Sequence, residues 1–194
     1  MASKGSAFER DVCKQLSLWW THNERDDVFW RTSTSGARAT TRRKAGLSTF
    51  GQYGDVQATD PIGQPLIDMF IIEIKRGYPK ATLSNVLDAG PHAKIQQLQR
   101  FIDQASSSAC DAGMNPTSWL LIHKRDRRIT TVTLPTLVYN SLRKDQNRKP
   151  FIIPFPILQY GLAYERGVSQ CHITQFPFAH FLENIRPERI KELA

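Results

Sequence analysis

The chain has 194 residues, a net charge of +8 and 40% hydrophobic residues. This length favours one domain with an ordinary buried core. No apolar run approaches the roughly 20 residues that span a bilayer, and the N-terminus lacks the apolar core of a secretory signal. The sequence therefore predicts a soluble, intracellular protein without a membrane partner, and its positive charge favours a polyanionic one.

The first predicted element is an amphipathic helix over residues 6–20. Its apolar residues recur at helical spacing, and Ser6 is the expected N-cap. Glu9 follows three residues later, so it fits either a capping box or a functional site. The nearby tryptophans Trp19, Trp20 and Trp30 are expected in the core rather than as stacking platforms for bases.

A basic loop over residues 31–54 follows this helix. The chain contains no acidic residue between Asp27 and Asp55, and Ser, Thr and Gly surround the basic side chains. This composition is typical of a segment that contacts a phosphate backbone, although a merely solvated loop is the alternative. Its basic residues are Arg31, Arg38, Arg42, Arg43 and Lys44.

The remainder of the chain alternates between strand and helix patterns, which predicts an α/β fold. The three cysteines are far apart in the sequence and are expected to be reduced, buried thiols: Cys13, Cys110 and Cys171. Strands are predicted at 55–59, 67–77, 118–124 and 129–134, with a polar linker at 60–65. Helices are predicted at 91–105 and 134–144, then an edge strand or extended wrap at 151–164, and a helix at 178–193 broken near Pro187.

Two opposite charges interrupt the most apolar of these strands. Glu73 and Lys75 are two residues apart, so they point to the same face of the strand. One interpretation is an idle ion pair. The other is a metal site, because antiparallel pairing with the preceding strand would bring Asp55 beside Glu73. Two carboxylates and the backbone carbonyl of Ile74 would suit Mg²⁺, and Lys75 could orient or deprotonate an attacking water.

These residues carry a family resemblance. Asp55 and the Glu73-Ile74-Lys75 run resemble the signature of the PD-(D/E)XK nuclease superfamily, which has a restriction-endonuclease-like fold. Within it, the stretch KGSAFER at 4–10 looks like the opening of archaeal-type Holliday junction resolvases, and RTSTSG at 31–36 is similar to their Ser/Gly-rich segment. The resemblance covers roughly residues 4–134, with Gly54 where the family usually has proline.

The resemblance implies an α/β fold with a mixed central β-sheet flanked by helices and a C-terminal extension. It implies Glu9, Asp55 and Glu73 as metal-site residues, Lys75 as the catalytic lysine, and Mg²⁺ (or Mn²⁺) as the cofactor. The expected domain division is a nuclease core over 1–145 and an extension over 146–194. The expected DNA contacts are Lys4, Arg31, Ser35, Arg38, Arg42, Arg43, Lys44 and Arg76.

The resulting hypothesis is a Mg²⁺-dependent endonuclease that acts as a homodimer on branched DNA such as a four-way junction. A restriction, repair or virus-encoded nuclease acting on duplex or flap DNA is the first alternative. The second is a DNA-binding protein that has the fold without turnover.

Overall fold

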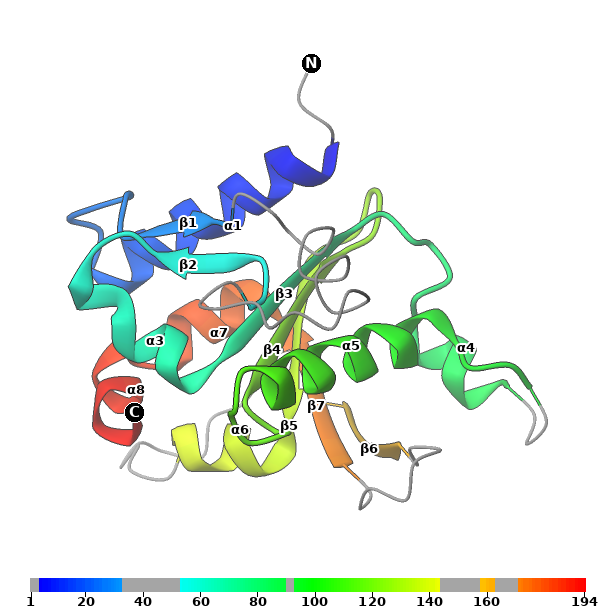
Figure 1. Ribbon diagram of the computed structural model, residues 1–194. Coiled ribbons are helices and arrows are strands. Elements are labelled where there is room, and N and C mark those ends of the chain that lie inside the picture. The colour runs from blue at the N-terminus through cyan, green and yellow to red at the C-terminus, as the bar shows by residue number, and fades with distance from the viewer. Residues whose placement is uncertain (1–3, 33–52, 90–92, 144–157, 163–170) are drawn as a thin grey trace, which may run out of the picture.

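A five-stranded mixed sheet forms the centre of the computed structural model, which describes residues 4–32, 53–89, 93–143, 158–162 and 171–194 (Figure 1). The strand order is β3-β4-β5-β7-β6, and only β3 and β4 run parallel. The predicted α/β fold with a mixed central sheet flanked by helices is therefore confirmed. The strands are β3 (Ile71–Arg76), β4 (Trp119–Lys124), β5 (Thr130–Pro135), β6 (Leu158–Leu162) and β7 (Cys171–Pro177).

Side-chain alternation divides the core into two layers, one on each face of the sheet. On one face, Ile72 and Ile74 pack in a large apolar cluster with the N-terminal helix and the C-terminal helices. On the other face, Ile71 packs with the helix α5 (Gln97–Asp111) and the short helix α4 (Leu83–Leu87). Each face of β3 therefore lies against a different set of helices.

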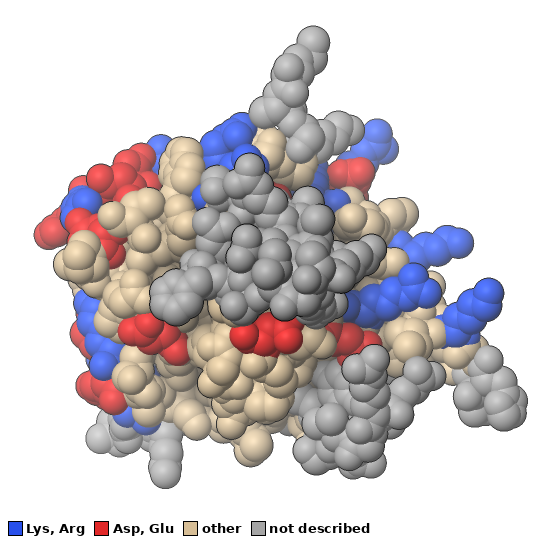
Figure 2. Space-filling view, viewed as in Figure 1, with Lys and Arg blue, Asp and Glu red and all other residues tan. Residues whose placement is uncertain are grey.

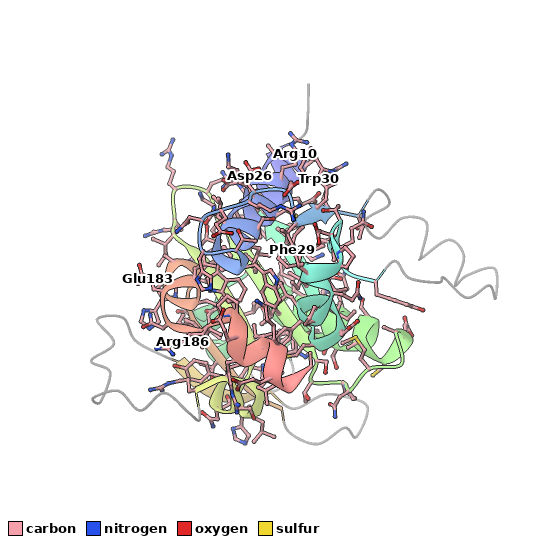
Figure 3. The ribbon with its side chains drawn as sticks, turned by 90° about the vertical axis from the view of Figure 1, so that its left-hand side faces the viewer. Arg10, Asp26, Phe29, Trp30, Glu183 and Arg186 are labelled. Atoms are coloured by element: carbon pink, nitrogen blue, oxygen red, sulfur yellow. The ribbon has the colours of Figure 1, made fainter. Side chains whose placement is uncertain are left out.

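The N-terminal helix and a small second sheet lie beside β3. The helix α1 (Lys4–Trp20) already includes Ser6, so the prediction that Ser6 is the N-cap is wrong. The strands β1 (Phe29–Arg31) and β2 (Val56–Ala58) pair antiparallel with each other. Phe29 is buried, whereas Trp30 is 47% exposed and lies at the periphery (Figure 3), which corrects the prediction that Trp30 belongs to the core.

The linker predicted at 60–65 is partly helical. A 3-10 turn, η1 (Pro61–Gly63), is capped by the Asp60 side chain, which accepts a hydrogen bond from the Ile62 N–H. The helix α3 (Gln64–Met69) follows directly and has a proline in its first turn. Proline is tolerated there because the first helical N–H groups have no partner within the helix. The strand that carries Glu73 consequently begins at Ile71 rather than at residue 67.

The last part of the chain contributes to the central sheet. After helix α6 (Thr136–Arg143), β6 forms the far edge of the sheet, which agrees with the edge strand that was one of the two predictions for 151–164. The sequence analysis did not predict β7, which lies between β5 and β6. Helices α7 (Phe178–Asn184) and α8 (Pro187–Leu193) are separated at the predicted break. The division into a core and an extension at residue 145 stays a prediction.

Two further findings concern cysteines and membranes. Cys13 is buried, but Cys110 is exposed, so the prediction of buried thiols is wrong for Cys110. Among the described residues, no helix combines the length and apolar character that crossing a bilayer requires.

The two-layer core yields a stability prediction. Leu120 is fully buried in β4, so Leu120→Ala should lower the free energy of unfolding by about 2–5 kcal/mol. Leu137→Ala on α6 is the matched control, because the Leu137 side chain is 75% exposed. Urea unfolding followed by circular dichroism measures both variants. Equal losses for the two substitutions would contradict the assignment of Leu120 to the core.

Candidate active site

Asp55 lies against the open edge of β3. Its backbone N–H donates to the Ile72 carbonyl at 2.7 Å, and its carboxylate Oδ2 accepts from the Ile74 N–H at 2.7 Å. The expected antiparallel pairing of the two strands does not occur, because β2 pairs with β1 instead. These two hydrogen bonds nevertheless bring the carboxylate beside the strand, as the hypothesis required.

Gly54 explains why proline is absent before the aspartate. Its φ of +76° lies in the left-handed region, which the proline ring cannot adopt. A Cβ atom at this position would lie only 2.9 Å from the Ile72 carbonyl oxygen. The close approach of the chain to β3 therefore requires glycine, and this approach is what presents Asp55 to Ile74.

Glu73 and Lys75 point to the α5 face of the sheet, as strand alternation predicted. The Lys75 ammonium lies 2.8 Å from Glu73 Oε2 and 4.0 Å from Asp55 Oδ2. It also lies 5.7 Å from the centre of the Phe101 ring on α5. Glu73 is 3% and Asp55 7% exposed, so this group is not the solvated surface ion pair of the alternative interpretation.

The electrostatics of this cluster are dominated by burial. Desolvation, followed by repulsion from Glu73, raises the pKa of Asp55 to about 7. Burial alone would lower the pKa of Lys75, but attraction to Glu73 and Asp55 outweighs it and raises the pKa above its ordinary value. Lys75 is therefore an ammonium at neutral pH, where Asp55 is still partly protonated.

Glu9 contributes to the raised pKa of Asp55, but among the described residues it does not complete a metal-binding group with the two carboxylates. It lies on α1, which packs on the opposite face of β3 from Glu73, and it accepts a hydrogen bond from Arg31 Nη1 at 3.0 Å. Among the residues that the structure describes, no three His, Cys, Asp or Glu side chains lie close enough to hold one metal ion. The expected convergence of three carboxylates is thus not observed, and a metal role for Glu9 stays a prediction.

The donor set still suits a hard divalent cation. Asp55 and Glu73 offer carboxylate oxygens in a buried, anion-rich position, and oxygen ligands are those that Mg²⁺ prefers. A bound cation would relieve the repulsion that raises the pKa of Asp55. The residues present therefore fit such an ion.

Sequence reasoning missed two residues at the rim of the site. Gln104 on α5 donates from Nε2 to Glu73 Oε2 at 3.0 Å. Its signal is its position three residues after Phe101, on the flank of the apolar face of α5. Tyr78 packs edge-on against Phe101 and contributes electrostatically to the raised pKa of Lys75. Tyr78 has a φ of +58°, and nothing in the sequence indicated this backbone conformation.

The predicted DNA contacts are only partly placed. Ser35, Arg38, Arg42, Arg43 and Lys44 lie outside the described residues, as does the side chain of Lys4 at the start of α1. Arg31 pairs with Glu9, and Arg76 lies 3.2 Å from Asp126 Oδ1 in the turn after β4. Arg31 and Arg76 are thus partly engaged within the protein.

Comparison with known families agrees with this geometry. The family described as "Phage putative PDDEXK endonuclease" matches residues 1–192. The chain therefore belongs to this phage branch of the PD-(D/E)XK nucleases, a superfamily that generally uses divalent metals and acts on DNA. No curated protein and no solved structure matches the chain significantly.

The raised pKa of Asp55 predicts how stability depends on pH in the metal-free protein. The folded protein holds this proton up to about pH 7, whereas the unfolded chain releases it near 3.8. Stability contributed by this group is therefore lost as the pH rises through that window. Asp55→Asn keeps an acceptor for the Ile74 N–H and removes the charge, so it should raise the melting temperature in EDTA at pH 8.

The size of this effect is at most about 4 kcal/mol, at roughly 1.4 kcal/mol per pKa unit, and it should shrink at pH 5. Asp11→Asn on α1 is the matched control, because Asp11 is exposed. Thermal unfolding at both pH values measures the three proteins. A lower melting temperature for Asp55→Asn at pH 8 would contradict the repulsion inferred at this site.

Gly54 provides a second prediction. Gly54→Ala adds a Cβ both to a left-handed backbone and to a position 2.9 Å from Ile72 O, so it should destabilise the fold by about 1–3 kcal/mol. Gly113→Ala is the control, since Gly113 has a φ of +75° but no atom within 4 Å of the added Cβ. Urea unfolding should show the larger loss for Gly54→Ala. A smaller loss than that of Gly113→Ala would remove the proposed steric constraint.

Proposed function

We propose that the protein is a Mg²⁺-dependent DNA endonuclease that hydrolyses phosphodiester bonds, with Mn²⁺ as a possible substitute ion. The observation that carries this proposal is the buried group of Asp55, Glu73 and Lys75 at the edge and on one face of β3. Membership of a phage endonuclease family supports the same chemistry.

The roles of the side chains follow from their positions. Asp55 and Glu73, with the Ile74 carbonyl, would hold the ion, which would supply a Lewis acid for the scissile phosphate. Lys75 is positioned as an ammonium to stabilise charge that develops on the phosphate oxygens or to orient the attacking water. The Gln104 amide fixes one oxygen of Glu73 and so orients the other.

The substrate is expected to be branched DNA. The similarity of the KGSAFER stretch to resolvases supports a four-way junction, and symmetric cutting of a junction requires a homodimer with two sites. Duplex or flap DNA is the alternative substrate, in keeping with the phage character of the family. The place of action would be the interior of the infected cell.

A substrate panel tests the proposal. Purified protein is incubated with Mg²⁺ or Mn²⁺ and with a four-way junction, a flap and a linear duplex of the same sequence. We expect cleavage of the junction by symmetric nicks. Glu73→Gln and Lys75→Met should each reduce the rate at least about 100-fold, a typical loss on removing a group that stabilises transition-state charge.

Glu183→Gln on α7 is the control for loss of one carboxylate, because Glu183 is exposed and lies at the periphery of the molecule (Figure 3). Undiminished cutting by Glu73→Gln would remove the proposed site. Preferential cutting of duplex or flap would leave the site in place and change the substrate. Metal-independent DNA binding without any cutting would favour a non-catalytic DNA-binding protein.

A further inference from the structure

The turn between β4 and β5 carries a dense cluster of positive charge that the proposed site does not use. Residues 124–128 read KRDRR, four basic residues and one acidic residue. Arg127 and Arg128 are exposed. In Figure 1 this hairpin extends past the end of β3, and in Figure 2 both basic and acidic side chains are visible at the upper right of the molecule.

The hairpin has a defined position relative to the active site. Lys124 is the register partner of Arg76, and the Gly77 N–H donates to the Lys124 carbonyl at 2.9 Å. The turn itself is closed by a hydrogen bond from the Arg128 N–H to the Arg125 carbonyl at 3.1 Å. The hairpin tip therefore lies directly beyond the C-terminal end of the strand that carries Glu73.

Asp126, the one acidic residue in this turn, forms an ion pair with Arg76 on β3. Arg76 Nη2 lies 3.2 Å from Asp126 Oδ1, and the Arg76 and Lys124 side chains both lie over the Phe8 ring of α1, at 5.7 and 5.8 Å. Among the described residues, Arg127 and Arg128 form no ion pair with an acidic group. Arg76 thus helps to hold the hairpin, and the arginines at the tip are left to face solvent.

We propose that the tip of the β4–β5 hairpin, through Arg127 and Arg128, binds the phosphate backbone of DNA that flanks the cleavage point. This inference rests on the proposed nuclease function and names a second contact between the same protein and its substrate. Side-chain and backbone contacts to phosphates fix where a protein sits on a duplex without reading its sequence.

The spacing suits one duplex arm. Three residue steps of β4 separate Leu121, the register partner of Glu73, from Lys124, which at about 3.3 Å per residue is roughly 10 Å, and the turn extends beyond Lys124. Since base pairs are about 3.4 Å apart, a duplex arm that runs along β4 would meet the hairpin a few base pairs from the scissile phosphate. Rigid attachment to β3 would keep this spacing constant, so the hairpin would set where on an arm the cut falls.

The test is the salt dependence of DNA binding without divalent metal. Arg127→Gln/Arg128→Gln and the wild type are titrated against a fluorescent duplex in EDTA at several salt concentrations. Loss of two phosphate contacts should make the slope of log K against log salt shallower by about 1.8, at roughly 0.9 per contact. Arg127→Lys/Arg128→Lys should retain the wild-type slope, because a point charge suffices for a phosphate.

The matched control is Arg186→Gln/Lys191→Gln, which removes the same net charge. Both residues are exposed and belong to the region of α8, which packs against α3 before the N-terminal end of β3. Figure 3 places Arg186 far from Arg10 on α1. We expect the control slope to match that of the wild type. A hairpin slope equal to the wild type, or an equal change in the control, would overturn the proposal.

This readout separates the two proposals. Binding in EDTA does not depend on cutting, so a shallower slope with no cleavage in Mg²⁺ would support the hairpin contact and reject the nuclease. Cleavage in Mg²⁺ with an unchanged slope would support the nuclease and reject the hairpin contact.

Discussion

The open edge of β3 is the constraint on which the site depends. A strand at the edge of a sheet leaves one row of backbone groups without a sheet partner. Here Gly54 and Asp55 fill part of that row: the Asp55 N–H donates to Ile72, and the Asp55 carboxylate accepts from Ile74. The same contact that protects the edge also fixes the carboxylate within 4.0 Å of Lys75 Nζ. Edge protection and site assembly are therefore one structural feature.

The grouping of Asp55 and Glu73 beside Lys75 lowers the stability of the metal-free fold but suits the proposed function. Packing Asp55 and Glu73 beside one ammonium leaves excess negative charge in a buried place, and the raised pKa of Asp55 records its cost. An amide side chain at position 55 would suit the isolated fold better, because it keeps an acceptor for the Ile74 N–H without the charge. Retaining two carboxylates there makes sense when a cation is part of the working protein, since its binding free energy offsets the repulsion. Local disagreement of this kind between sequence and stability is what functional sites commonly show.

How far the sequence predicted this site depended on the range of the interactions. Alternation within β3 placed Glu73 and Lys75 correctly, because the geometry of a strand is local. The position of Glu9 could not be predicted in the same way: α1 packs on the other face of β3, and no local pattern specifies which face a helix covers, so its role at the ion stays a prediction. Gln104 was missed for a similar reason: its partner Glu73 is 31 residues away. Strand β7 was missed because it lies between β5 and β6, and sheet order is also a long-range property.

The contacts of Arg76 within the protein suggest a structural role beside the DNA contact that was expected from the sequence. In sequence it follows Lys75 and was expected to contact DNA directly. In the structure Arg76 forms an ion pair with Asp126 and lies over the Phe8 ring, so it connects β3, α1 and the β4–β5 hairpin. The planar Arg76 guanidinium contacts Asp126 on one side and the Phe8 ring on the other, so it can hold the hairpin in place with little further loss of conformational freedom. The exposed positive charge is instead carried by Arg127 and Arg128, where the proposed DNA backbone could approach it. The proposed metal site and the basic hairpin are in this way linked through Arg76 and through the pairing of β3 with β4.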